Sequence, residues 1–351
     1  MEVRLSWRIP GSCDGGFLSL AADGTVDSRR SGVRLVHVPR ATLWLALGMT
    51  VSISPPTCTP ADNEASSGQK ADIVAVADDT GYQIEFQRSP ARVISVAPNV
   101  TEIMFAIGAE NKLIGVTDIC NFPPAAKEKP KIGSFVSPNL EKIVSFEPDL
   151  VIGCGTLHPT LGRLRELGVR VLSFNPCTID ELLVMVEKIG MAVGLEDKAR
   201  ELTEPLQDEI EDVRSRVATL ESSDRVRVFV ELWHDPLMTA GAGSFVNDLV
   251  HTAGAINVAA AVGRHYFAVS HEHVLDADPQ VILAAYMEKG MSPRDMILNR
   301  VTWRNVSAVS SGRVFDDIDP DLLLRPSVRA VHTVTELAER FYPELFSIRA
   351  Q

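Results

Sequence analysis

NLEKIVSFEPDLVIG (139–153) and SHEHVLDADPQVILA (270–284) are two stretches of one chain that align with each other without a gap. Each stretch predicts a short helix that begins at a polar cap, then a proline, then a four-residue apolar strand. Glu141 and Glu272 are the third residues of their stretches. A carboxylate there suits the positive end of a helix, but its presence in both copies also indicates two matched carboxylates on one surface. We therefore predict a duplicated unit, and hence two similar lobes.

The sequence around this repeat alternates short β-branched runs with amphipathic helical stretches. RVISVA (92–97) and RVRVFVEL (225–232) predict the buried strands that begin the two units, and VILAAY (281–286) predicts a further strand. Strands that alternate with helices are typical of a parallel sheet covered on both faces. The expected fold class is therefore α/β, with two α/β lobes that each contain a central sheet.

The region between the two units has a different pattern, because residues 178–220 are helical in pattern almost throughout. We expect one long helix at about 196–220 to join the lobes. The predicted organisation is an export signal with an N-terminal extension (1–57), a flexible linker (58–77), an N-terminal α/β lobe (78–177), a helical connection with the backbone helix (178–220) and a C-terminal α/β lobe (221–351). Two such lobes enclose a cleft at the carboxyl ends of their strands, where open α/β sheets bind ligands.

The start of the chain has the pattern of an export signal. ATLWLALGMTVSIS (41–54) is an apolar run preceded by arginines and followed by two prolines. As a helix it would span about 21 Å, short of the ~30 Å hydrocarbon core of a membrane, so it indicates a secretory signal. Cys58 follows directly and precedes a polar tract, as a lipid-modified cysteine would, although Pro55 and Pro56 are unusual before such a site. We expect a periplasmic or cell-surface protein, with Cys58 as a candidate lipid anchor and its only membrane contact.

Composition excludes several classes of function. The 34 basic and 46 acidic residues give a net charge of −12, which phosphate backbones would repel, so nucleic acid is not an expected partner. The five cysteines show no zinc-type spacing, and we predict no metal site in the protein itself.

Catalytic motifs are also missing from the sequence. GAGSFV (241–246) lacks the third glycine of a dinucleotide-binding loop, and no G-x-S-x-G or H-E-x-x-H motif occurs. Cys120, Cys154 and Cys177 follow predicted strands, so an enzyme with a cleft thiol is a minor alternative, and Cys154 with Cys177 could instead form a disulfide. We predict a binding protein with no catalytic residues.

DDTGYQIEF (78–86), SPARVISVAPNV (89–100), VELWHDPLMTAGAGSFVNDLV (230–250) and DIDPDLLLRPSVRA (317–330) occur in that order. The ordered set resembles the helical-backbone substrate-binding proteins of ABC importers, which carry cobalamin, ferric siderophores and haem. The resemblance covers residues 78 to about 346 and implies the class III periplasmic-binding-protein fold, with one long rigid helix between the lobes. It also implies that Glu141 and Glu272 dock against arginines of a permease dimer, which works with its ATPase subunits. We expect the binding protein to be a monomer.

Within that family, the pattern is most similar to cobalamin-binding members, in which aromatic side chains of both lobes line the cleft. The resemblance places Phe122, Phe135 and Tyr266 at such positions, and Asp321 with Arg325 at those of a polar pair that reaches the amides of the ligand. Trp233 lies just beyond a predicted strand end and is another candidate wall. A large flat ligand fringed with amides needs such apolar walls and a few placed donors. The expected ligand is a cobalt corrinoid, and no resident cofactor is expected.

Two other ligands remain as alternatives, since cobalamin binders usually carry Trp or Tyr where this chain has Phe at 122 and 135. Haem needs an axial donor, for which the candidates are His158, His234, His265 and Tyr266. A ferric siderophore with carboxylate or catecholate groups would need several arginines in the cleft, where Arg325 is the stronger candidate and Arg264 the weaker.

Overall fold

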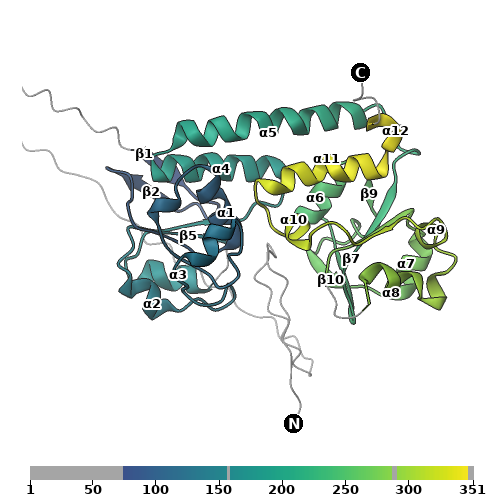
Figure 1. Cartoon of the computed structure of the whole chain (residues 1–351), viewed down its shortest axis with the longest axis horizontal. Helices are drawn as coiled ribbons and strands as arrows, with labels where there is room; N and C mark the ends of the chain where they lie inside the picture. Colours follow the sequence, from purple (N-terminus) through teal and green to yellow (C-terminus); the bar gives the residue numbers. More distant parts are fainter. Residues whose placement is uncertain (1–73, 156–158, 287–290, 347–351) are drawn as a thin grey trace, which may run out of the picture. The chain divides into compact units, whose positions relative to one another are not determined.

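The N-terminal lobe is built on a parallel sheet. The computed structural model describes residues 74–155, 159–286 and 291–346, so the predicted export signal and Cys58 lie outside the described residues (Figure 1). Four strands form this sheet in the order β4-β3-β5-β6. They are β3 (Val93–Ser95), β4 (Leu113–Val116), β5 (Leu150–Cys154) and β6 (Val171–Phe174). The helices of the lobe are α1 (Pro98–Ala106), α2 (Leu140–Ser145) and α3 (Pro159–Glu166), with 3-10 turns at Glu110–Lys112 and Pro124–Glu128.

The C-terminal lobe repeats this plan with an added antiparallel pair. Its sheet has the order β10-β8-β7-β11-β12, and β9 also pairs with β7. The strands are β7 (Arg227–His234), β8 (Leu237–Ala240), β9 (Ile256–Asn257), β10 (Tyr266–Ala268), β11 (Val281–Ala284) and β12 (Val314–Phe315). The helices are α6 (Phe245–Thr252), α7 (His271–Ala277), α8 (Pro293–Leu298), α9 (Ser307–Ser310), α10 (Pro320–Leu324), α11 (Arg329–Phe341) and α12 (Pro343–Phe346), with a 3-10 turn at Val301–Trp303.

The two copies of the sequence repeat adopt the same local structure. Leu150 and Val281, which the alignment makes equivalent, begin β5 and β11, and they pair in parallel with β3 and β7. Glu147 and Asp278 are also equivalent, and both have a positive φ, of 44° and 39°. This left-handed conformation is uncommon outside glycine, so finding it at the same place twice confirms the duplication at the level of the backbone.

Matched arginines stabilise this corner of each lobe. Arg92, just before β3, donates hydrogen bonds to the carbonyl oxygens of Phe146 and Glu147 at the end of α2. Arg227, the first residue of β7, donates to the carbonyl oxygens of the equivalent Ala277 and Asp278 at the end of α7. A cation suits these carbonyls because the last carbonyls of a helix have no partner within it.

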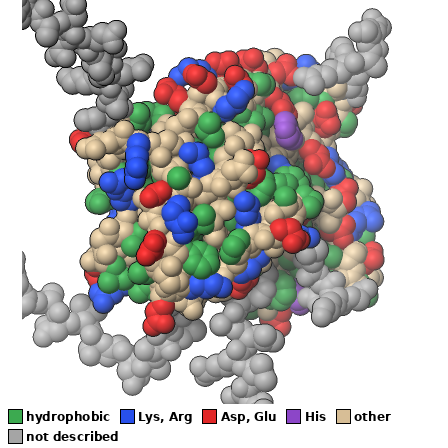
Figure 2. Space-filling model, turned by 60° about the vertical axis from the view of Figure 1, so that its left-hand side comes forward, with side chains coloured by type: hydrophobic (Ala, Val, Ile, Leu, Met, Phe, Trp, Pro, Cys, Tyr) green, Lys and Arg blue, Asp and Glu red, His purple; other side chains and the backbone are tan. Residues whose placement is uncertain are grey.

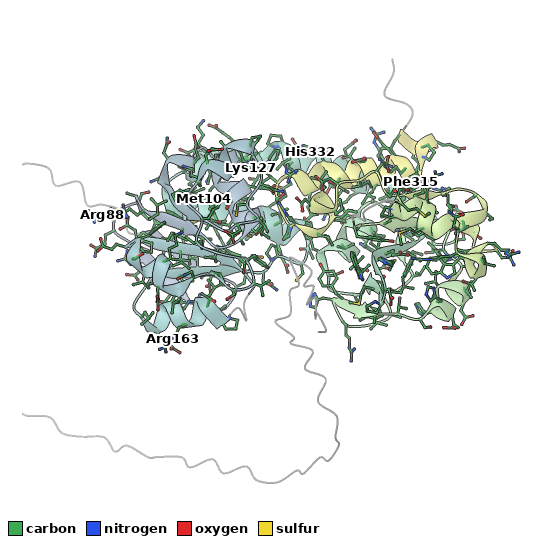
Figure 3. The ribbon with its side chains drawn as sticks, turned by 60° about the horizontal axis from the view of Figure 1, so that its bottom comes forward. Arg88, Met104, Lys127, Arg163, Phe315 and His332 are labelled. Carbon is green, nitrogen blue, oxygen red and sulfur yellow. The ribbon has the colours of Figure 1, made fainter. Side chains whose placement is uncertain are left out.

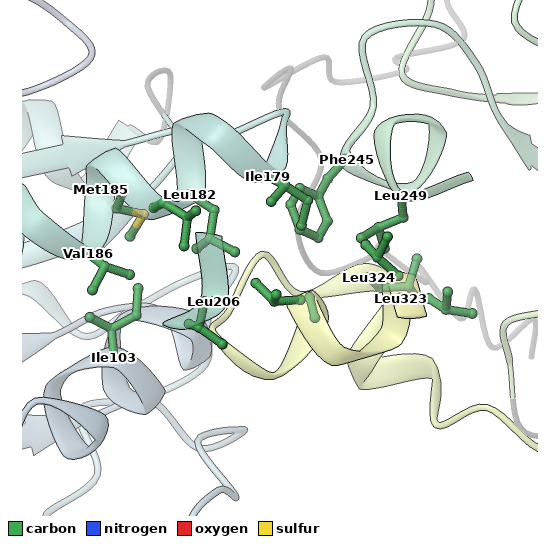
Figure 4. Packing of buried hydrophobic residues seen from close by; sticks show 14 of the residues in the cluster. Ile103, Ile179, Leu182, Met185, Val186, Leu206, Phe245, Leu249, Leu323 and Leu324 are labelled. Atoms are coloured by element: carbon green, nitrogen blue, oxygen red, sulfur yellow. The ribbon is translucent and has the colours of Figure 1, made fainter. Parts of the chain in front are cut away.

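A continuous hydrophobic core joins the lobes. Helix α4 (Ile179–Val193) and the 22-residue helix α5 (Glu196–Val217) run between them, and α5 packs along α4 and α11 (Figure 1). Figure 4 shows buried side chains from several helices in one cluster, among them Ile103 of α1, Leu206 of α5 and Phe245 of α6. Moving the lobes apart at this point would expose apolar surface to water, at a free-energy cost of ~25 cal/mol per Å². The connection between the lobes is therefore stiff. The chain thus has the two α/β lobes and the long connecting helix of the class III fold.

The N-terminal edge of the described chain differs from the prediction. Residues 58–77 were expected to be a linker, but Val74–Ala77 form strand β1, which pairs antiparallel with β2 (Gln83–Phe86). A strand forms here because buried and exposed residues alternate along the chain, and the buried Val76 lies opposite the buried Ile84. The buried Asp78 then anchors this hairpin to the N-terminal lobe through an ion pair with Arg165. Among the described residues, no helix has the length and apolarity needed to cross a membrane.

Candidate ligand-binding cleft

A hollow of about 10 Å³, which is room for about one water molecule, lies between the two lobes. Its lining consists of Pro98, Asn99, Phe135 and Cys154 from the N-terminal lobe and Leu324, Arg325 and Pro326 from the C-terminal lobe. Cys154 ends β5, so the hollow is at the carboxyl ends of the strands, as in other open α/β sheets. It is small beside the ~300–1,000 Å³ of typical ligand pockets. The lobes approach closely here because polar groups link them across the hollow.

Glu102 is the centre of these links. This α1 carboxylate is 3% exposed, and it accepts hydrogen bonds from Arg329 Nε and Nη2 at 2.8 and 2.9 Å. Arg325 Nη1 lies 3.5 Å from the same carboxylate. Burial lowers the pKa of Arg329, but the hydrogen bond and charge of Glu102 outweigh burial and raise that pKa above its ordinary value. One carboxylate of the N-terminal lobe therefore holds two arginines of the C-terminal lobe.

Arg325 has further partners in both lobes. Its Nη1 donates to Asn121 Oδ1 at 2.7 Å, and its Nη2 lies 2.8 Å from Asp321 Oδ2. Asn121 also donates to Asp321, at 3.3 Å. Two arginines and two carboxylates therefore meet beside the hollow, and their formal charges cancel.

The structure brings together some of the predicted ligand residues. Phe135 and Arg325 both line the hollow. Phe122 is 40% exposed, and the guanidinium of Arg329 lies over its ring, 3.9 Å from the centroid. Asp321 belongs to the polar network, whereas Trp233 and Tyr266 lie outside the lining of the hollow.

Tyr266 nevertheless has a relation to Phe135 that sequence reasoning missed. Phe135 lies four residues before the cap Asn139, and Tyr266 lies four residues before the cap Ser270. Both aromatic rings are half-buried, and Tyr266 begins strand β10. Each lobe thus has one half-buried aromatic side chain shortly before its repeat helix, in a bend at Phe135 and in strand β10 at Tyr266.

Trp233 belongs to an aromatic cluster at the carboxyl end of β7. Its ring centroid lies 5.0 Å from that of His234 and 5.7 Å from that of Tyr286, and the His234 ring stacks on Tyr286 at 5.8 Å. His158, another candidate axial donor, lies outside the described residues, and His265 immediately precedes β10. The cluster gives the C-terminal lobe a second aromatic surface near its strand ends.

A buried carboxylate supports this cluster. Glu231 is fully buried in β7, and Tyr286 donates its hydroxyl hydrogen to Glu231 Oε1 at 2.6 Å. Arg300 pairs with both carboxylate oxygens of Glu231, at 2.6 and 2.7 Å. Burial and the charge of Glu231 raise the pKa of Tyr286 well above its ordinary value, so the phenol stays protonated. The signal for this triad was available in the sequence, because Glu231 is a lone acidic residue in an apolar strand.

Cys154, the cysteine that lines the hollow, is not suited to catalysis. It is a free thiol, as is Cys120. Burial raises the pKa of Cys154 to about 11, so the nucleophilic thiolate is scarce at neutral pH. No group of three or more His, Cys, Asp or Glu side chains within the described ranges is arranged to hold a metal ion.

The two repeat glutamates lie on a different part of the surface. Asn139 caps α2 by accepting from the Lys142 backbone amide, and Ser270 caps α7 in the same way. Glu141 and Glu272 stand in the first turns of these helices, and both are exposed. Two hydrogen bonds to the carboxylate of Glu272 lower its pKa. The larger effect comes from the backbone amide of Glu272 and the smaller from the Ser270 hydroxyl. This carboxylate is therefore charged at neutral pH.

Comparison with known proteins identifies the class. Residues 93–321 match the family model described as periplasmic binding protein. An uncharacterized ABC transporter substrate-binding lipoprotein of Bacillus subtilis, YvrC, is 29% identical, over 88% of this chain and 98% of its own length. The chain belongs to the periplasmic binding protein family and is a substrate-binding component of an ABC importer, not an enzyme.

Two solved structures show the same fold. The periplasmic vitamin B12 binding protein BtuF of Vibrio cholerae is 27% identical, with a TM-score of 0.63, and the match covers 75% of this chain and 99% of that chain. The periplasmic heme-binding protein RhuT from Roseiflexus sp. RS-1, in apo form, is 26% identical, with a TM-score of 0.63, and the match covers 74% of this chain and 100% of that chain. Both relatives are periplasmic, and one is a vitamin B12 binding protein whereas the other is a heme-binding protein.

Proposed function

We propose that this protein captures a cobalamin-like corrinoid between its lobes and delivers it to the permease of its importer. The main support for this proposal is the balance of charge beside the hollow. Arg325 and Arg329 are neutralised by Glu102 and Asp321, so the site has placed hydrogen-bond donors without net positive charge. Such a site favours a ligand fringed with neutral amides over one fringed with carboxylates.

The donors and walls of the site also suit a corrinoid. Arg325 Nε is buried and has no hydrogen-bond partner among the described residues, so it can donate to an amide oxygen of a ligand. Phe135 in the hollow and Tyr266 offer one aromatic ring from each lobe, although Tyr266 is outside the present lining. Widening the hollow enough for a tetrapyrrole requires the surrounding loops to separate. The vitamin B12 binding relative adds support from sequence.

Haem is the second candidate, because an imidazole near the strand ends could serve as an axial ligand once its surroundings open. His234 Nδ1 is buried and has no hydrogen-bond partner among the described residues, and the ring lies at the carboxyl end of β7. An anionic siderophore is less well matched, because the arginines beside the hollow already have carboxylate partners. Other arginines of the N-terminal lobe, such as Arg88 and Arg163, lie at its outer edge (Figure 3).

Delivery requires a docking surface, for which we propose the exposed carboxylates of Glu141 and Glu272. They would pair with arginines of a permease dimer, one from each subunit. The same proposal places the protein outside the cytoplasmic membrane after export, with Cys58 as a candidate lipid anchor.

Isothermal titration calorimetry with cobalamin, cobinamide, haem and a ferric siderophore tests the ligand. We expect a dissociation constant of about 1 μM or tighter, about −8 kcal/mol, for the corrinoids alone. Arg325→Met should weaken that binding about tenfold or more, whereas the exposed control Arg163→Met should not. Tight binding of haem, with a Soret shift lost in His234→Ala, would replace the corrinoid by haem.

A further inference from the structure

The repeat carries a second matched pair of exposed side chains besides its glutamates. Val144 in α2 and Leu275 in α7 are equivalent in the gapless alignment, and they are 40% and 39% exposed. Single exposed apolar residues are common on protein surfaces, and Figure 2 shows apolar side chains scattered among charged ones. Two exposed apolar residues at the same position of both copies are more informative than a single one. The duplication places each of them beside the same neighbouring side chain.

Those neighbours are the repeat glutamates. Val144 follows Glu141 by three residues and Leu275 follows Glu272 by three, so in each helix the two side chains lie on one face. Ile143 and Val274, in contrast, are fully buried and fix the inward face of each helix. Each lobe therefore presents a carboxylate beside an apolar side chain, and we call each of these pairs a bipartite patch.

We propose that the two bipartite patches, Glu141 with Val144 and Glu272 with Leu275, together form the surface that the permease dimer recognises. This inference rests on the proposed function, because it assumes docking through the glutamates. A surface that occurs twice fits a partner that presents one complementary surface twice, as the subunits of a dimer do. Each subunit would present a basic side chain next to a small apolar depression.

The carboxylate and the apolar side chain of each bipartite patch would contribute to binding in different ways. The carboxylate attracts a basic partner over a distance and gives an association that salt weakens. The apolar side chain contributes only once it is covered, and its contribution changes little with salt. The combination gives an exposed valine and an exposed leucine a role on a protein whose net charge is −12.

Binding of the full chain to its permease–ATPase complex in lipid nanodiscs tests the proposal. The variants V144S and L275S remove the apolar halves, and V184S and L167S are matched controls, since Val184 and Leu167 are 50% and 51% exposed outside the patches. Each patch variant should weaken association about threefold to tenfold, and the double variant about tenfold to hundredfold, in both low and high salt. The controls should bind like the wild type.

Three outcomes would overturn the proposal. If V144S/L275S binds normally while E141Q/E272Q binds weakly, the glutamates dock and the apolar residues do not take part. If neither double variant loses affinity, the docking function of this face fails as well. If V144S/L275S binds the importer normally but converts a dimer of the protein into monomers in sedimentation, the apolar residues serve contact with a second copy.

Discussion

Replacement of Glu102 by Gln should destabilise the protein strongly, although the change adds no bulk. The carboxylate is 3% exposed and pairs with two arginines of the other lobe. Gln keeps one acceptor, but its amide nitrogen then faces a guanidinium donor. Arg325 retains Asp321 and Asn121, whereas Arg329 loses its carboxylate.

The size of the effect follows from that geometry. Removing one partner of a buried ion pair typically costs about 3–5 kcal/mol. The Arg329 side chain is 22% exposed, so water can solvate part of the freed charge, and we expect a loss of about 2–3 kcal/mol in the free energy of unfolding. For a folded chain of this size that corresponds to about 3–6 °C in the unfolding midpoint.

Urea denaturation followed by circular dichroism measures the loss. The control E201Q removes an exposed carboxylate paired with Lys198 on one helix and should cost no more than about 0.5 kcal/mol. The double variant E102Q/R329Q should lose less than the sum of its single variants, because neither charge is then left without a partner. A loss in E102Q no larger than that of the control would show that this ion pair does not hold the lobes together.

Three other predictions concern the interior. Cys154, with its pKa raised to about 11 by burial, should react with a disulfide reagent at about pH 8 far more slowly in the folded than in the urea-unfolded protein, and equal rates would contradict its burial. Tyr286→Phe removes a donor from the buried Glu231 and should cost about 1–3 kcal/mol in urea denaturation; no loss would contradict the hydrogen bond. Gly153→Ala should cost about 1–3 kcal/mol, because the added Cβ would lie 2.7 Å from Val96 Cγ2; a neutral result would mean that the core can shift there.

Much of the fold could be predicted because it depends on local patterns. The alternation around residues 92–97 and 225–232 gave strands where β3 and β7 lie. The gapless repeat gave the caps at Asn139 and Ser270, which the structure confirms. The hairpin at the N-terminal edge was missed in part, since β1 has only four residues and is held by the distant Arg165.

The polar network of the site could not be predicted from patterns. Glu102 and Arg329 are 227 residues apart, and a glutamate within a helix is ordinarily solvated. In the folded protein Glu102 is buried beside Arg325 and Arg329 of the C-terminal lobe. The same holds for Arg325. The family resemblance assigned it, with Asp321, to the ligand, and in this structure it also links the two lobes through Asn121. The roles of Phe122, Phe135, Trp233, Tyr266, Asp321 and Arg325 in ligand binding remain proposals.

Uptake of labelled cobalamin by the importer, reconstituted in proteoliposomes, tests most directly whether capture and delivery use separate surfaces. The variant E141R/E272R reverses both docking charges and leaves the hollow untouched. We expect its affinity for cobalamin to equal that of the wild type while uptake falls to the level seen without binding protein. Uptake at the wild-type rate would contradict the account, because delivery would then not depend on the carboxylates that the repeat places on both lobes.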